Sequence, residues 1–275
     1  MAVHQEVGEL DFQRDSNRLP PLYNHLLLTE TQRDRIDVVL VSPRNPLNIG
    51  AAARAMANFG FSRLAVVAPY APHWREARSA IGAPELLAAA TETATLAEAV
   101  TGCTLVVGTG TVTHRKPEQT VVSLPDLAPL VSRELARGGR VAVVFGPEKH
   151  GLTREDLSYC HLLVEIPTDL RQPSMNLGQA VAVCLYELAC RAFLPEKGAP
   201  EAVADGVRST APSGDLELLA GVVEEVMTAT GYSPRSMQPA NRHDLRLLLR
   251  RLALNKRDAR RVMGLFRRIL WRLKH

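Results

Sequence analysis

Three short polar loops in this 275-residue chain carry the side chains best suited to bind a ligand or assist a reaction. Arg54 offers a guanidinium that could hold a phosphate or a carboxylate. Glu148 stands between two glycines and offers a carboxylate. The third loop, 172–180, opens a long apolar segment in which Ser174 or Asn176 could cap a helix and leave unpaired backbone N–H groups beside it. A surface arginine, a simple turn and a plain helix cap remain the respective alternatives.

The position of Arg54 favours a ligand for an electrostatic reason. We expect a helix over 51–59, after Gly50, which permits close backbone approach. Arg54 then falls near the start of that helix, where the helix dipole disfavours a cation. Such a placement is easier to understand if the guanidinium holds an anion.

The elements that position these loops read as alternating strands and helices. Apolar runs rich in β-branched residues predict buried strands at 38–41, 64–68, 105–108, 141–145 and 162–167. A helix between the first two strands makes a βαβ crossover, so the sheet is parallel. Loops at the carboxyl ends of parallel strands share one edge of the sheet, where ligands usually bind. We therefore expect the three loops to converge on one pocket in an α/β domain with helices on both faces.

Other enzyme classes lack their sequence signatures. The segment Gly108-Thr109-Gly110 supplies only two glycines of the dinucleotide-binding pattern, and no clear helix follows it. The chain has no phosphate-binding loop with its lysine and no G-x-S-x-G nucleophile turn. These absences argue against a dehydrogenase, a nucleotide hydrolase and an esterase.

Composition indicates a globular protein of the cytoplasm. Apolar residues make up 46% of the chain, yet no run is long and apolar enough for a membrane span or a signal peptide. The four cysteines form no Cys-x-x-Cys pair, so we interpret them as reduced core residues and expect no zinc or other metal site. These cysteines are Cys103, Cys160, Cys184 and Cys190.

Charge is distributed unevenly along the chain. The segment 235–275 holds 13 Lys and Arg against 2 Asp and Glu, so it carries +11 while the other residues carry −7. Its apolar residues follow helical spacing, with most arginines on the opposite faces. We expect a lead-in at 1–33, the α/β domain at 34–195, a linker at 196–214 and a basic helical module at 215–275. Nucleic acid is the first partner that such a module suggests.

The three loops together resemble the motifs of a known enzyme superfamily, the SPOUT (SpoU–TrmH) RNA 2′-O-ribose methyltransferases. The match includes residue types, spacing and order, and its longer forms most resemble the TrmJ branch, which modifies the tRNA anticodon loop. The matching segments are Asn48-x-Gly50-x-x-x-Arg54, Phe145-Gly146-x-Glu148-x-x-Gly151-Leu152, and Ile166-Pro167 followed by Ser174-Met175-Asn176-Leu177.

The resemblance implies a parallel sheet with a C-terminal trefoil knot, an exception to the rule against threaded chains. It implies S-adenosyl-L-methionine as cofactor, a homodimer with both sites at its interface, and the basic helices as an appended RNA-binding domain. Arg54 and Asn48 match the residues that the superfamily assigns to catalysis. The implied cofactor cradle comprises Thr109, Gly110, Thr111, Gly146, Ile166, Ser174, Met175 and Asn176. Met175 replaces a commoner leucine, and Gly110 stands where many relatives carry serine or another small residue.

The implied reaction moves a methyl group to a ribose 2′-oxygen, with a cytidine or uridine of the tRNA anticodon loop (position 32) as the expected target. An arginine pKa of roughly 12.5–13.8 makes Arg54 a reluctant base. We expect Arg54 to grip the adjacent phosphate and stabilise the developing alkoxide, and Asn48 to fix Arg54 or the ribose. Glu148 either holds its own loop or receives the proton through water. A ribosomal RNA methyltransferase and a non-catalytic RNA-binding relative remain the alternatives.

Overall fold

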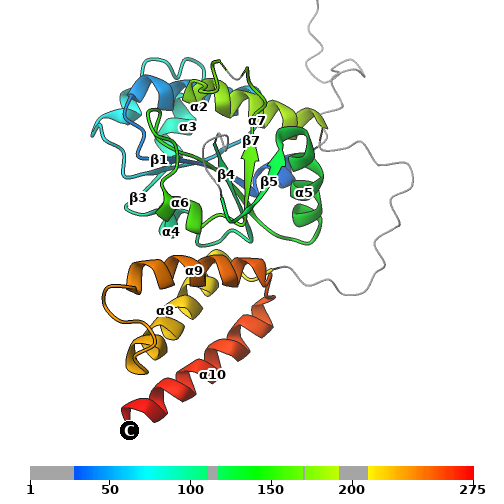
Figure 1. Ribbon diagram of the computed structural model, residues 1–275. Coiled ribbons are helices and arrows are strands. Elements are labelled where there is room, and N and C mark those ends of the chain that lie inside the picture. Colours follow the sequence, from blue (N-terminus) through cyan, green and yellow to red (C-terminus); the bar gives the residue numbers. More distant parts are fainter. Residues whose placement is uncertain (1–27, 111–116, 170, 192–209) are drawn as a thin grey trace, which may run out of the picture.

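The computed structural model describes residues 28–110, 117–169, 171–191 and 210–275 (Figure 1). Its main body is a seven-stranded, fully parallel sheet in the order β3-β2-β1-β6-β4-β7-β5. The strands are β1 (Ile36–Val41), β2 (Arg63–Val67), β3 (Thr91–Thr93), β4 (Leu105–Thr109), β5 (Thr120–Ser123), β6 (Val141–Phe145) and β7 (Leu162–Glu165). The predicted α/β class with a parallel sheet is confirmed.

Helices cover both faces of the sheet. The larger core packs α2, α3, α5 and α7 on one face, and the smaller core packs α4 and α6 on the other (Figure 1). Beside a 3₁₀ turn at Trp74–Glu76, the helices in the described ranges are α1 (Glu30–Arg33), α2 (Pro46–Asn58), α3 (Pro84–Ala89), α4 (Leu96–Ala99), α5 (Leu124–Ala136), α6 (Arg154–Ser158), α7 (Leu177–Arg191), α8 (Ser213–Ala229), α9 (Gln238–Arg251) and α10 (Lys256–Lys274).

All five predicted strands are present, and two others escaped prediction. β3 and β5 are the edge strands of the sheet, and most of their residues are exposed. These edge strands need no continuous apolar run, because their side chains are not buried on both faces as those of the central strands are. The pattern of buried β-branched residues therefore finds the centre of the sheet and misses its rims.

Two helices begin earlier than predicted. Asn45 caps α2 by accepting a 2.9 Å hydrogen bond from the backbone N–H of Leu47, and Pro46 fills the first helical position. Helix α8 begins at Ser213, two residues before the predicted start of the helical module, so Asp215 lies in its first turn. In both cases a proline marks the true start: Pro46 is the first residue of α2, and Pro212 precedes the first residue of α8.

The C-terminal helices form a small module with its own apolar core. Helices α8, α9 and α10 pack around a buried cluster, which comprises Leu219, Ala220, Val223, Leu245, Leu249 and Met263. The predicted apolar stripes are only partly buried, because Leu248, Leu252 and Leu265 are 45%, 54% and 60% exposed. The module lies below the sheet in Figure 1, with α9 nearest to it.

Three of the four cysteines lie in the cores of the α/β domain. Cys103, Cys160 and Cys184 are buried, Cys190 is half-buried, and all four are free thiols. Burial raises the pKa of Cys160 and of Cys184 to about 12, so these thiols stay protonated at neutral pH. The predicted core role is confirmed. Separately, no helix in the described ranges has the length and apolar character of a transmembrane segment.

Candidate active site

The carboxyl ends of β4, β6 and β7 surround a cavity of about 270 Å³. Six of the predicted cradle residues line it: Thr109, Gly110, Gly146, Ile166, Ser174 and Met175. Asn176 does not line the cavity, and Thr111 lies outside the described residues. The volume is near the lower end of the ~300–1,000 Å³ usual for small-molecule sites. The predicted convergence of the strand ends therefore creates a hollow suited to a small ligand.

Gly146 shapes this cavity by allowing its loop to fold back on itself. A Cβ at position 146 would lie 2.2 Å from the backbone nitrogen of Leu152 and 2.3 Å from the carbonyl carbon of Gly151. Both contacts involve backbone, so no side-chain rotation could relieve them. By contrast, a Cβ at Gly110 would meet no atom of the described residues within 4 Å. Gly146 is therefore required for its loop to close, whereas Gly110 leaves open space at the cavity wall.

A chain of side-chain hydrogen bonds joins the three predicted loops. Asn48 donates from Nδ2 to Glu148 Oε1 at 2.8 Å. Asn176 in turn donates from Nδ2 to Asn48 Oδ1 at 3.0 Å. Residues separated by 100 and 128 positions in the sequence are thereby brought into contact. The predicted meeting of the loops is confirmed within a single chain, but the first loop joins the other two through Asn48 and does not itself line the cavity.

Glu148 anchors its loop to the start of α2. Besides the bond from Asn48, its carboxylate accepts backbone N–H bonds from Arg44 at 3.1 Å and from Asn45 at 3.3 Å. Partial burial by itself would raise the pKa of Glu148, but these donors outweigh it and hold that pKa below its usual range. A carboxylate whose oxygens are occupied by three donors is suited to fixing the two loops relative to each other.

Asn176 has two structural tasks. Its Oδ1 accepts from the backbone N–H of Gly178 at 2.9 Å and of Gln179 at 3.4 Å, which caps the first turn of α7. Its Nδ2 remains available to reach Asn48. Of the two predicted capping candidates, Asn176 is the one that caps the helix, while Ser174 faces the cavity. The cap therefore ties the orientation of α7 to the first loop.

Arg54 lies apart from the cavity of its own chain. It is exposed on α2, is absent from the cavity lining, and makes no hydrogen bond or ion pair within the described part of the chain. Because α2 begins at Pro46, Arg54 lies in the third turn, and the expectation that it opposes the dipole at the helix start is wrong. Gly50 does permit a close approach, as predicted, but the approaching segment is that of Ser79 and Ala80.

Several cavity residues were not among the predicted site residues. Five of them are other positions of the same motifs: Phe145, Glu148, Gly151, Leu152 and Leu177. The rest lie between or beside the motif positions, and they comprise Pro147, Lys149, His150, Thr168, Pro173 and Ala180. Thr168 is the clearest omission, because its hydroxyl donates to the carbonyl of Pro173 at 3.4 Å and closes the third loop. A polar residue between a strand end and a helix cap is a signal that could have identified it.

Comparisons with known proteins agree with this architecture. Residues 35–186 match the family described as the SpoU rRNA Methylase family. A Pseudomonas aeruginosa protein named tRNA (cytidine/uridine/adenosine-2′-O-)-methyltransferase TrmJ is 36% identical over 245 residues, covering 86% of this chain and 93% of its own length. A Yersinia enterocolitica protein named tRNA (cytidine/uridine-2′-O-)-methyltransferase TrmJ is 32% identical over 241 residues, covering 86% and 90%.

A solved structure extends the similarity to three dimensions. The crystal structure of TrmJ from Z. mobilis ZM4 matches with a TM-score of 0.73 and 31% sequence identity, covering 85% of this chain and 98% of that one. The family match spans the strands and loops that build the cavity. This chain belongs to the SpoU rRNA Methylase family.

Proposed function

We propose that this protein is an S-adenosyl-L-methionine-dependent methyltransferase that modifies a ribose 2′-oxygen of tRNA, at a cytidine or uridine of the anticodon loop. The observation that carries the proposal is the hydrogen-bonded junction of Asn48, Glu148 and Asn176 beside the cavity. The names of the P. aeruginosa and Y. enterocolitica relatives support tRNA as the substrate. With tRNA as substrate, we place its action in the cytoplasm.

The cavity residues fit such a cofactor. Phe145, Ile166 and Leu177 offer apolar surface for a flat base and an aliphatic chain, while the loops around Gly110 and Gly146 bring backbone close to a ligand. We assign cofactor binding to Thr109, Gly110, Thr111, Gly146, Ile166, Ser174 and Met175, with Asn176 holding the third loop in place. When bound, the cofactor supplies a methyl group attached to a sulfonium. Transfer of that methyl group releases a neutral thioether, which is a good leaving group.

The chain must then orient the ribose and stabilise charge on its oxygen. We assign to Arg54 the grip on a neighbouring phosphate and the stabilisation of the developing alkoxide. Asn48 is placed to orient the third loop through Asn176, since its own carbonyl oxygen already accepts that bond. Glu148 acts as the anchor of its loop, because its carboxylate oxygens are occupied by Asn48 and two backbone donors.

The position of Arg54 supports a homodimer whose sites lie at the interface. Leu47 and Arg54 are seven residues apart and therefore share one face of α2. Leu47 is 54% exposed, and Tyr186 on the adjoining helix α7 is 52% exposed. Large exposed apolar side chains on two adjoining helices, with an arginine on one of them that has no ion pair among the described residues, favour a surface that a second copy covers. In that assembly Arg54 would serve the cavity of the partner.

The strand order supports the trefoil knot. β6 inserts between β1 and β4, and β7 inserts between β4 and β5, so the last two strands occupy positions inside the sheet formed by earlier ones. We propose that α7 completes the knot by returning to pack on α2 and α5.

RNA binding is assigned to the C-terminal module, with domain limits at 34–195 and 215–275. On α10 exposed arginines recur away from the module core, and four of them are Arg257, Arg260, Arg267 and Arg272. Within the described residues these four make no ion pair, so their charges are available to phosphates. Trp271 is 46% exposed, but Arg268 lies over its ring at 4.4 Å and His275 stacks on it at 5.1 Å, so we assign it no base-stacking role.

Methyl incorporation into RNA tests the proposal directly. Purified protein, labelled cofactor and total RNA should give label in the tRNA fraction, located at a ribose of the anticodon loop by mapping 2′-O-methyl sites. Label in ribosomal RNA alone would overturn tRNA as the substrate. RNA binding with no incorporation into either fraction would indicate the non-catalytic alternative.

A further inference from the structure

Two arginines of the basic module do not face solvent. Arg246 and Arg250 of α9 are only 8% and 5% exposed, although the sequence places them among the residues expected on the cationic exterior. They point from α9 toward α6, which belongs to the α/β domain. A buried guanidinium requires a paired charge or several hydrogen-bond acceptors. The partners of Arg246 and Arg250 therefore indicate the role of each side chain.

The acceptors come from both parts of the molecule. Arg246 pairs with Glu155 of α6, and its Nε donates to Glu217 of α8 at 2.9 Å. Arg250 donates from Nη2 to the other oxygen of Glu217 at 3.0 Å. One carboxylate of the module therefore holds both guanidiniums in position, and Arg246 extends the contact to the α/β domain.

Tyr159, at the end of α6, is the second half of this contact. Its backbone carbonyl accepts from Arg250 Nε at 2.9 Å. Its ring lies under both guanidiniums, at 4.3 Å from Arg246 and 5.6 Å from Arg250. The arginines also lie at the carboxyl end of α6, where the helix dipole favours positive charge. The two guanidiniums thus hold the same end of α6.

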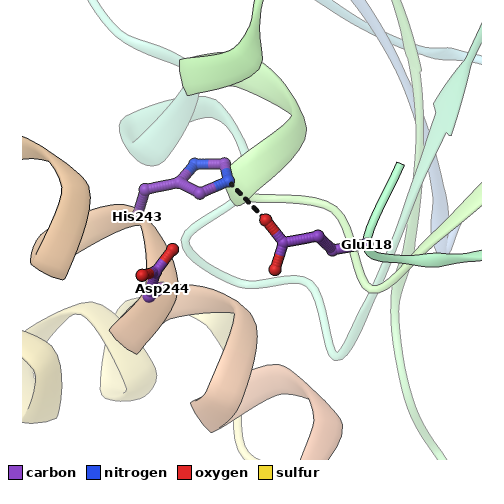
Figure 2. Close-up of side chains that lie close together, drawn as sticks. All are labelled: Glu118, His243 and Asp244. Carbon is purple, nitrogen blue, oxygen red and sulfur yellow. Dashed lines mark ion pairs between the residues drawn. The ribbon is translucent and has the colours of Figure 1, made fainter. Parts of the chain in front are cut away.

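A third contact lies at the edge of the same interface. Figure 2 shows His243 of α9 pointing to Glu118, with Nε2 at 3.8 Å from Oε1. Glu118, His243 and Asp244 have ligand atoms close enough for a metal ion, within 4.8 Å of one another. However, His243 Nδ1 has no hydrogen-bond partner among the described residues, whereas a metal-binding histidine usually donates its other N–H. Arg154 also lies 3.8 Å from Glu118, so we interpret the group as an interdomain contact.

The clamped helix is directly connected to the cavity. The loop that lines the cavity continues from Gly151 into α6, whose cap Thr153 bonds reciprocally with Asp156. The module has a second anchor at the amino end of β4, where Ser213 donates its backbone N–H to the carbonyl of Cys103 at 2.9 Å. The cavity lies at the carboxyl ends of the strands, so the module contacts the opposite end of the sheet, where the strands begin.

We propose that Arg246 and Arg250 are positioning residues that lock the RNA-binding module to α6, and so fix where bound RNA lies relative to the methyl-donor cavity. This rests on the proposed function. The two arginines are distinct from the exposed arginines of α10: they contribute orientation, whereas those of α10 contribute affinity for phosphate. The distinction explains why the module, strongly basic as it is, buries two of its charges away from RNA.

The test compares Arg250→Met with Arg251→Met in the full-length protein. Both variants remove one arginine from the same helix, but Arg251 is exposed and makes no hydrogen bond or ion pair with any described residue. We expect Arg250→Met to enlarge the particle in small-angle X-ray scattering and to lower kcat/KM for tRNA by about 10- to 100-fold, chiefly through KM. Calorimetry should show unchanged cofactor affinity. Arg251→Met should retain the compact scattering profile.

A second variant guards against misfolding of the first. Tyr159→Leu removes the ring beneath both guanidiniums and leaves both arginines in place, and it should give the same expansion and the same KM effect in smaller degree. Equal scattering and equal KM for Arg250→Met, Tyr159→Leu and Arg251→Met would overturn the proposal. Failure of the proposed function is separate: the unmodified protein would transfer no methyl group to tRNA, while scattering would still distinguish Arg250→Met from Arg251→Met.

Discussion

The side-chain amide of Asn48 lies 2.8 Å from the carboxylate of Glu148 and is joined through its own carbonyl oxygen to Asn176. Neither partner is near Asn48 in the sequence, yet each belongs to a different loop of the cavity. The asparagine amide can donate and accept at once, so it bridges an acceptor-only carboxylate and a donating amide. This relationship explains why an asparagine, and not an aspartate, suits the position.

Glu148→Gln should loosen this junction. The substitution places an amide donor beside backbone N–H groups that now donate to a carboxylate, and it should reduce the free energy of unfolding by about 1–3 kcal/mol. Cofactor affinity should fall as well, because the same loop lines the cavity. Thermal melts and cofactor calorimetry measure both effects. Unchanged stability and affinity, with methyl transfer lost, would instead assign Glu148 to proton transfer.

Stability should also depend on pH through Glu148. Its pKa is held below the usual value in the folded protein, so the carboxylate contributes stability above the unfolded pKa, near 4.5. That contribution is lost as the pH falls through the lower, folded pKa. The melting temperature of the unmodified protein should therefore decline more steeply below about pH 4.5 than that of Glu148→Gln. Parallel curves for the two proteins would contradict this assignment.

Arg54→Ala should abolish methyl transfer and leave cofactor binding intact. Loss of a group that stabilises charge in the transition state typically lowers kcat by on the order of 10²–10³. Arg54 is outside the cavity lining, so calorimetry should show an unchanged cofactor affinity. Loss of that affinity would place Arg54 in the cofactor site.

The proposed dimer makes a further prediction about Arg54. An inactive Arg54→Ala protein, mixed with a Gly146→Ala protein that cannot form its own cavity loop, should recover activity in mixed dimers, because one subunit retains an intact arginine and the other an intact cavity. Activity after subunit exchange checks this expectation. Absence of recovery, with mixed dimers confirmed by mass, would place Arg54 and the cavity that it serves in the same chain.

Gly146→Ala and Gly110→Ala should differ in their effects. The first forces a Cβ to within 2.2 Å of a backbone nitrogen, so it should cost about 1–3 kcal/mol of stability and weaken cofactor binding. The second meets no atom within 4 Å in the part of the chain that the structure describes, and it should leave stability unchanged. Chemical denaturation of the two variants gives the comparison. Equal losses of stability would show that the loop around Gly146 can relax.

Charge removal on α10 should weaken RNA binding in a salt-dependent manner. Replacing Arg260 and Arg267 with Gln keeps the helix and removes two exposed charges. The slope of log affinity against log salt should fall by roughly 0.7–0.9 per lost phosphate contact. Arg137→Gln, at an exposed position after α5, is the matched control. These point variants are preferable to deletion of 215–275, which would uncover the ring of Tyr159.

The sequence by itself determined the centre of the fold and the composition of the site. Buried strands are apolar on both faces, so β1, β2, β4, β6 and β7 were visible as continuous β-branched runs. Glycines and polar residues at the strand ends marked the three loops. The parallel crossover then required the loops to share one edge of the sheet.

Only the tertiary structure decided how individual side chains are used. Helical spacing does not distinguish an arginine that faces solvent from one that faces another domain. Arg246 and Arg250 therefore resemble their exposed neighbours in the sequence, and only the packing of α9 on α6 shows that they are buried. Likewise, Arg54 was expected at a helix start, but a proline one turn earlier moved that start. Local pattern determines which residues share a face; the partner that covers the face comes from contacts between residues far apart in the sequence.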